Sequence, residues 1–112
     1  MPATPPAAAL GPLDFDHLER MTFGEKALER EVLAMFVAQS ATLLDALATR
    51  PAETAALAHT LKGSARAIGA FKVASCAATL ETAGPGDDAA LAALRHAVGE
   101  ARTAIDARLG RP

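Results

Sequence analysis

The sequence predicts an all-α fold, an antiparallel up-down four-helix bundle with a short additional helix at its amino-terminal end. About a quarter of the residues are alanine, whereas β-branched residues are scarce and show no alternating pattern. Four stretches place apolar residues three and four positions apart, and short connections rich in proline or glycine separate them. With 112 residues, the chain is long enough for one domain with a hydrophobic core of its own.

The amino-terminal region divides into a tail and a short helix. Residues 1–13 contain four prolines and no basic side chain, which is typical of a flexible tail rather than of a signal peptide. The folded domain is therefore expected to span residues 14–110. Asp14 or Asp16 would cap the short helix, which is expected to end near Met21.

A long second helix is expected over residues 25–49. The run Thr22-Phe23-Gly24-Glu25 matches a capping box, in which the threonine and the glutamate satisfy free amides of the first turn. Arg50-Pro51-Ala52 ends this helix, and Pro51 suits the first turn of the next one. The residues expected on the buried face of the long helix are Leu28, Val32, Met35, Phe36, Gln39, Leu43 and Leu47.

The remaining pattern predicts a tight hairpin of two helices and then a last long helix. The hairpin helices are expected over residues 52–68 and 71–83, with Gly69 as a left-handed cap between them. Gly84-Pro85-Gly86 then breaks the chain, and Asp87 or Asp88 would cap the last helix. The apolar positions of the last helix, at the spacing of a bundle, are Leu91, Leu94, Val98, Ala101, Ile105 and Leu109.

One face of the third predicted helix carries the clearest chemical signal. At about 100° of rotation per residue, burying the leucines of this helix turns His59 outward, with Lys62, Gly63 and Arg66 on the same side and Ala55 one turn earlier. A glycine inside a helix costs about 1 kcal/mol relative to alanine, so Gly63 suggests that another molecule approaches closely. An exposed imidazole beside two cations suits a phosphoryl group, because the ring nitrogen is a nucleophile near neutral pH.

The other reactive side chains have simpler interpretations. His17 and His96 are expected at the solvated surface, and Cys76 is expected to be a small buried thiol. Histidines and carboxylates do not occur at the paired spacing of a metal site in a helical bundle, so no bound metal is expected. No nucleophile lies beside a base in the pattern of a hydrolase, so we expect no autonomous enzymatic activity.

A longer motif surrounds His59 and continues into the next predicted helix. It consists of His59-Thr60-Leu61-Lys62-Gly63-Ser64-Ala65, then Ile68-Gly69-Ala70, Cys76 and Leu80-Glu81. This motif resembles the signature of histidine phosphotransfer (HPt) domains of two-component phosphorelays. The resemblance implies that His59 accepts the phosphoryl group, that Lys62 neutralises it, and that Glu81 accepts a hydrogen bond from the other imidazole nitrogen.

The same resemblance implies partners. HPt domains exchange phosphoryl groups with an aspartate of response-regulator receiver domains, which supply Mg²⁺ and most of the catalysis, and they also meet sensor or hybrid histidine kinases. The protein would then be a phosphoryl carrier without a cofactor of its own. The partner-binding surface would surround His59 and include Ala55, Gly63 and Arg66. Phe15, Leu18 or Met21 of the short helix would extend this surface, although these apolar residues could equally pack against the core.

Two other interpretations remain open: a bundle that binds and sequesters a receiver or kinase without phosphorylation, and a piece of a hybrid kinase. The net charge of -2 and the absence of Trp and Tyr disfavour binding to nucleic acid or to an anionic membrane. The longest uncharged run inside the expected folded domain, residues 32–44, is shorter than the roughly 20 residues that span a bilayer. We therefore expect a cytoplasmic, monomeric protein, and the high alanine content suggests a bacterial source.

Overall fold

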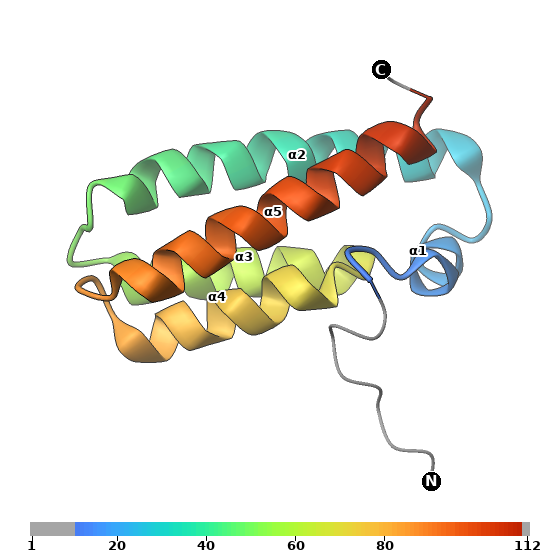
Figure 1. Cartoon of the computed structure of the whole chain (residues 1–112). Helices are drawn as coiled ribbons and strands as arrows, with labels where there is room; N and C mark the ends of the chain where they lie inside the picture. Colours follow the sequence, from blue (N-terminus) through green and yellow to red (C-terminus); the bar gives the residue numbers. More distant parts are fainter. Residues whose placement is uncertain (1–10, 111–112) are drawn as a thin grey trace, which may run out of the picture.

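The described part of the chain is entirely helical. The computed structural model describes residues 11–110, which form five helices and no strand, as the sequence predicted. Four long helices lie side by side in alternating directions, and the short α1 lies at one end of the bundle (Figure 1). The helices are α1 (Phe15–Met21), α2 (Lys26–Ala48), α3 (Thr54–Ile68), α4 (Phe71–Ala83) and α5 (Asp88–Arg108).

The closest packing in the bundle is between α3 and α4. Both helices bury small side chains, Ala58 and Ala65 on α3 and Ala74 and Ala77 on α4, so that their backbones approach closely. Leucines from all four long helices fill the rest of the core and are almost fully buried. The α3–α4 hairpin is therefore the most closely packed pair of helices, and it carries the predicted site.

The turn between α3 and α4 also holds α1. Gly69 caps α3 with φ of 89°, the left-handed conformation that the sequence predicted. A side chain there would approach the backbone oxygen of Asp14 to 2.8 Å, and the Asp14 amide donates to the Gly69 carbonyl at 2.9 Å. Asp14 caps α1, as predicted, by accepting from the His17 amide. A glycine is thus needed both for the turn and for the close approach of α1.

His17 is not the solvated residue that the sequence predicted. Its side chain is half-buried, with Nε2 3.2 Å from the Ala67 carbonyl oxygen and its ring edge-on to Phe71 at 5.1 Å. This contact fastens α1 to the α3–α4 hairpin, because the ring bridges the end of α3 and the start of α4. The local acidic sequence around His17 gave no indication of it.

A cluster around Arg108 fastens the opposite side of α1. The Arg108 guanidinium donates to both carboxylate oxygens of the buried Glu29, at 2.9 and 3.3 Å, and to Glu19 at 3.1 Å. It also lies 4.7 Å above the ring of Phe15. The hydrogen bonds from Arg108 hold the pKa of Glu29 below its usual value, against the opposing effect of burial. The last turn of α5 thereby joins α1 and α2.

The predicted capping box at the start of α2 is wrong. The Thr22 hydroxyl donates to the Leu18 carbonyl at 2.8 Å and so closes α1, and α2 begins only at Lys26. Phe23 and Gly24 both adopt left-handed conformations, with φ of 56° and 72°. The chain therefore turns for two further residues before it can enter the next helix, and the threonine cannot reach the first-turn amides of α2.

The buried face of α2 is rotated from the predicted one. Phe36, Leu43 and Leu47 are buried as predicted, whereas Met35 and Gln39 are exposed. The buried face of α2 also contains Glu29, whose carboxylate pairs with Arg108. The full set of buried residues on α2 is Glu29, Leu33, Phe36, Ser40, Leu43 and Leu47.

α2 also has the length and apolar composition of a possible membrane span, contrary to the sequence-based expectation. Helices in the cores of soluble proteins meet the same two conditions, so this finding is weak evidence for a membrane. In the described structure, α2 packs against α3 and α5 within the bundle.

The remaining boundaries agree more closely with the predictions. α4 has the predicted bounds, and Asp87 caps α5 by accepting from the Ala90 amide at 2.9 Å. α3 begins at Thr54, two residues later than predicted, and the Thr54 hydroxyl donates to the Pro51 carbonyl just before it.

Cys76 is only half-buried, whereas the sequence predicted a buried thiol. This partial burial raises the pKa of the Cys76 thiol.

Candidate functional site at the α3–α4 hairpin

His59 projects from the exposed face of α3. The seam of this helix consists of Thr54, Ala58, Leu61, Ala65 and Ile68, which are all buried. His59 follows Ala58 directly and so points away from the core, and its side chain is largely exposed. The core packing of α3 therefore presents the imidazole to solvent, as the helical periodicity predicted.

Glu81 reaches His59 from the neighbouring helix α4. One of its carboxylate oxygens, Oε2, lies 2.9 Å from Nδ1 of His59. An ionised carboxylate can only accept hydrogen bonds, so Nδ1 carries the proton and donates it. In the neutral ring, the lone pair of the nucleophile then belongs to Nε2, the nitrogen at the outer tip of the side chain.

The other oxygen of Glu81 holds Lys62, a contact that the sequence did not predict. Lys62 Nζ donates to Glu81 Oε1 at 2.6 Å, and its side chain is mostly buried while its ammonium group lies beside the histidine. The hydrogen bond from Lys62 is the main reason that the pKa of Glu81 lies below its usual value, and the bond from His59 adds to it. Glu81 is therefore a carboxylate at neutral pH that orders both an imidazole and a cation.

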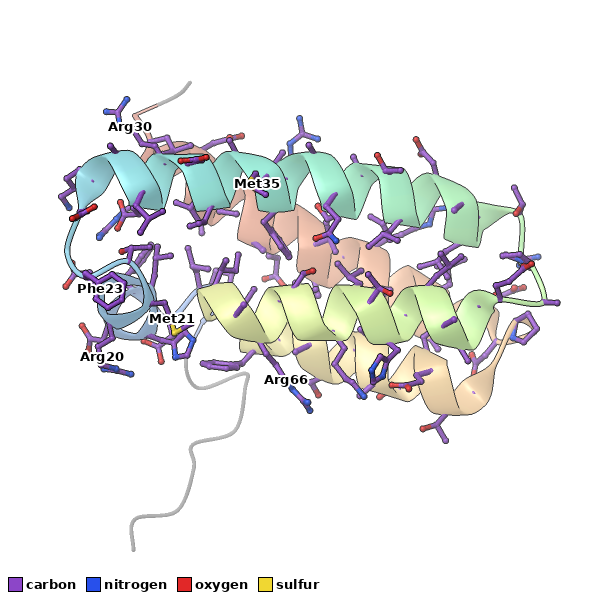
Figure 2. The ribbon with its side chains drawn as sticks, turned by 180° about the vertical axis from the view of Figure 1, so that it is seen from behind. Arg20, Met21, Phe23, Arg30, Met35 and Arg66 are labelled. Atoms are coloured by element: carbon purple, nitrogen blue, oxygen red, sulfur yellow. The ribbon has the colours of Figure 1, made fainter. Side chains whose placement is uncertain are left out.

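The surface next to His59 is open. Ala55 and Gly63 are exposed on the same face, and a side-chain carbon placed on Gly63 would meet no atom within 4 Å. Arg66 is exposed and points away from the bundle in Figure 2. The structure thus brings His59, Lys62 and Glu81 into contact and leaves Ala55, Gly63 and Arg66 as an accessible surface around them.

Comparison with known families identifies this arrangement. The Hpt domain family model matches residues 31–104, about two thirds of the chain, including both helices of the site. The protein belongs to the Hpt domain family. No curated protein and no solved structure matches the chain. Hpt domains have a histidine phosphotransfer role in two-component signalling, act as phosphoryl carriers rather than enzymes, and interact with receiver domains and kinases.

The match to the Hpt family does not include α1. The three apolar residues of α1 that were predicted for partner binding differ in exposure. Leu18 is completely buried and attaches α1 to the bundle, whereas Phe15 lies beneath the Arg108 guanidinium and is still 38% exposed. Met21, in contrast, is about half exposed at the end of α1. The accessible apolar residues of α1 in this Hpt domain are therefore Phe15 and Met21.

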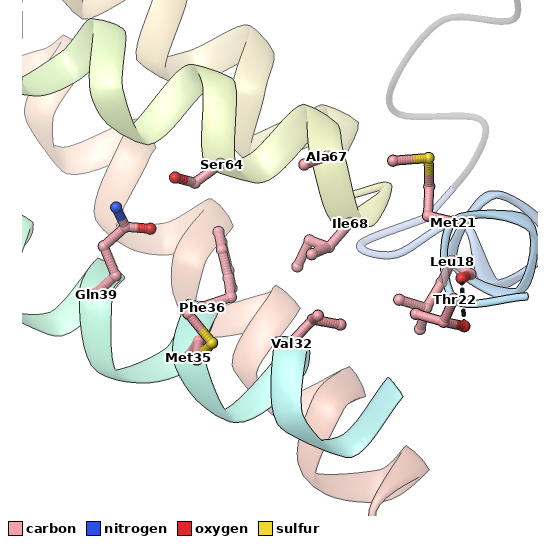
Figure 3. A pocket seen from close by; sticks show the side chains of 10 residues that line it. All are labelled: Leu18, Met21, Thr22, Val32, Met35, Phe36, Gln39, Ser64, Ala67 and Ile68. Carbon is pink, nitrogen blue, oxygen red and sulfur yellow. Dashed lines mark hydrogen bonds between the residues drawn. The ribbon is translucent and has the colours of Figure 1, made fainter. Parts of the chain in front are cut away.

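An apolar groove of about 250 Å³ extends this surface. Figure 3 shows side chains of α2 along one side of the groove and side chains of α3 along the other, with Leu18 and Met21 of α1 at one end. Ser64 and Ala67 on its α3 side directly follow the exposed Gly63 and Arg66. Sequence reasoning missed the groove because it placed Met35 in the core, and only the observed rotation of α2 exposes that side chain.

Outside the α3–α4 hairpin, two features bear on chemistry: another exposed histidine and the arrangement of potential metal-ligating side chains. His96 is exposed, as predicted, and lies 3.5 Å from Glu100 of the same helix. Within residues 11–110, no group of three or more histidine, cysteine or acidic side chains is arranged to hold a metal ion.

Proposed function

We propose that His59 is the phospho-acceptor of this Hpt domain and that it exchanges a phosphoryl group with an aspartate of receiver domains. In the forward step, Nε2 attacks the phosphorus of an aspartyl phosphate, the nitrogen–phosphorus bond forms, and the phosphorus–oxygen bond to the aspartate breaks. The aspartate leaves as a carboxylate, and the reverse step passes the group to a second receiver. The proton on Nδ1 stays in its hydrogen bond with Glu81 throughout.

The contact between His59 and Glu81 is the observation that carries this proposal. It fixes the ring so that Nδ1 faces α4 and Nε2 faces solvent, which is the orientation that attack on an external phosphorus requires. Lys62 supplies a positive charge beside the new phosphoryl group, and Arg66 lies about two turns beyond His59 on the exposed side of α3. The partner receiver would bring the magnesium ion, so the protein itself works as a carrier.

The surface around His59 also suits a docking partner. Gly63 and Ala55 add no bulk above the imidazole, and the apolar groove begins one residue beyond Gly63. A receiver that aligns its aspartate with Nε2 would cover these residues together. The extent of this surface, from Ala55 through Gly63 to the groove, favours contact with a folded domain rather than with a small phosphate donor.

The test is to incubate the protein with a receiver domain phosphorylated on its aspartate and to follow the phosphate. The wild-type protein should acquire phosphate that is labile in acid and stable in alkali, as expected for phosphohistidine. His59→Ala should acquire none, and His96→Ala, which removes another exposed histidine, should behave like the wild type. Phosphate on His59→Ala would disprove the assignment, and binding of the receiver without any transfer would favour the sequestering bundle.

A further inference from the structure

The acceptor that holds His59 carries a negative charge, which orientation of the ring does not require. Nδ1 of His59 lies 2.9 Å from Oε2 of Glu81, and an uncharged amide oxygen could accept the same hydrogen bond. A carboxylate this close to a phosphoryl group on Nε2 would repel it, so the charge opposes phosphorylation unless it has a separate role. The charge of Glu81 therefore needs an explanation of its own.

Lys62 keeps Glu81 ionised. Its ammonium group donates to Oε1 at 2.6 Å, which leaves Oε2 for His59. The side chains of Lys62 and Glu81 are only 17% and 29% exposed, so water screens their charges less than at an open surface. The hydrogen bond from Lys62 is the main reason that the pKa of Glu81 lies below its usual value. At neutral pH, Glu81 therefore stays a carboxylate and does not take the proton from the imidazole.

Glu81 and Lys62 are the only charged side chains in contact with this cluster within residues 11–110. The hydrogen bonds and ion pairs of His59 and Glu81 involve only each other and Lys62. Other titratable side chains lie on the two hairpin helices and on the neighbouring ends of α2 and α5, but they form no such bond with either residue. They are Asp45, Arg50, Glu53, Arg66, Lys72, Cys76, Asp87 and Asp88.

The proton on Nδ1 decides whether a phosphorylated ring can pass its phosphoryl group on. When the neutral ring donates the lone pair of Nε2 to phosphorus, the ring becomes a cation and Nδ1 keeps its proton. In the return step, the nitrogen–phosphorus bond breaks, its electron pair goes back to Nε2, and the leaving group is neutral imidazole. If Nδ1 had first lost its proton to solvent, the leaving group would be imidazolate, which is far more basic and therefore leaves more slowly.

We propose that the negative charge of Glu81 keeps Nδ1 of phosphorylated His59 protonated, so that the domain can pass the phosphoryl group on at and above neutral pH. This inference rests on the proposed function and gives Glu81, a positioning residue, a role in the return step that its orienting contact does not require. An opposite charge within hydrogen-bond distance favours the protonated ring. The His59 side chain is 66% exposed, so solvent would remove the proton more readily without that charge.

The experiment uses Glu81→Gln, which keeps an acceptor oxygen and removes the charge, and Glu100→Gln, which makes the same change beside His96. Each protein is phosphorylated by a receiver domain, separated from it and mixed with unphosphorylated receiver and Mg²⁺, and the return rate is measured by rapid quench. Between about pH 7 and about pH 8.5, the return rate of Glu81→Gln relative to the wild type should fall about fivefold. The relative forward rate should stay within about twofold, because attack starts from the neutral ring. Glu100→Gln should match the wild type in both directions.

Nitrogen NMR of the isotope-labelled, phosphorylated proteins reports the Nδ1 proton without any transfer step. The wild type should keep this proton to a pH about one unit higher than Glu81→Gln does. Coincident titrations, or return rates with the same pH dependence, would overturn the inference and leave His59 as the acceptor. A loss of forward and return transfer that is equal at both pH values would also overturn it, because Glu81 would then only orient the ring. Absence of phosphate from wild-type His59 would overturn the proposed function itself, and this inference with it.

Discussion

Two histidine clusters in this molecule have almost the same composition. His59, Glu81 and Lys62 join α3 to α4, while His96, Glu100 and Lys72 join α5 to α4. The histidines are similarly exposed, at 66% and 75%, and the lysine lies 2.6 Å from the carboxylate in both. In both clusters, the hydrogen bond from lysine is the main reason that the pKa of the glutamate lies below its usual value.

The geometry separates the two clusters. Glu81 comes from a different helix and uses one oxygen for each partner, so it engages Nδ1 and leaves the outer Nε2 free. Glu100 lies one turn after His96 on the same helix, and a single oxygen, Oε1, faces both Lys72 and Nε2 of His96. The outer nitrogen of His96 is therefore directed at a carboxylate. Which ring nitrogen is held, rather than the charges nearby, distinguishes the proposed acceptor His59 from His96.

Removing the carboxylates should give the largest difference. Glu81→Ala frees the His59 ring to rotate, and we expect the rate of phosphoryl transfer to fall about 100-fold, because productive attack depends on alignment. Glu100→Ala should stay within about twofold of the wild type, since His96 takes no part. Transfer from a phosphorylated receiver in a rapid-quench experiment measures both. In Glu81→Gln, the amide oxygen can still accept a hydrogen bond from Nδ1 of His59, so this variant should keep most of the wild-type rate. If Glu81→Ala transfers as fast as the wild type, Glu81 does not orient the ring.

Removing the lysines should give a smaller difference. Lys62→Ala loses one positive charge beside the phosphoryl group, and we expect phosphoryl transfer to slow about tenfold. This effect is smaller than that of Glu81→Ala, because the receiver supplies most of the charge stabilisation. Lys72→Ala removes an equivalent ion pair from the other cluster and should not slow transfer. Melting temperatures of the two variants serve as the control. Equal slowing in both would mean that ion pairs between helices, rather than charge at the site, support the reaction.

The contrast between local and distant signals explains what the sequence could predict. The bounds of α4 were predicted correctly because glycines next to it, Gly69 and Gly84, mark both ends. The exposure of His59 follows from the periodicity of one helix. In contrast, the rotation of α2 depends on Glu29, whose partner Arg108 lies 79 residues away. No local pattern reveals that a glutamate is buried, so Met35 was placed in the core and the groove was missed.

The site shows the same division. The contact between His59 and Glu81 was expected only from the resemblance to HPt domains, since the two residues are 22 positions apart. The bond between Lys62 and Glu81 depends on how the α3–α4 hairpin packs, and no spacing within one helix predicts it. The alanines that let α3 and α4 approach closely are visible in the sequence, but the pairing that they allow is not.

Acid should affect the two clusters alike. Because the pKa values of Glu81 and Glu100 lie below their usual value of 4.5, each stabilises the fold at neutral pH, and this stabilisation is lost as the pH falls from about 5 through the lowered pKa. The urea midpoint should therefore be lower near pH 3.5 than near pH 6 in the wild type. In Glu81→Gln and Glu100→Gln, the difference between the two pH values should be smaller. A steeper pH dependence in either variant would contradict the direction of these pKa shifts.

The smallest effects concern the glycine that accompanies each histidine. Gly63 follows His59 by four residues and Gly99 follows His96 by three, and an added side-chain carbon meets no atom within 4 Å at either position. Alanine should therefore stabilise both helices, by about 0.5–1 kcal/mol in the free energy of unfolding. Only Gly63→Ala should also slow transfer, by a few-fold, because its methyl group projects into the space above the imidazole that a receiver would occupy. If Gly63→Ala is more stable and transfers as fast as Gly99→Ala, the partner does not approach over Gly63, and the docking surface lies wholly on the side of the groove.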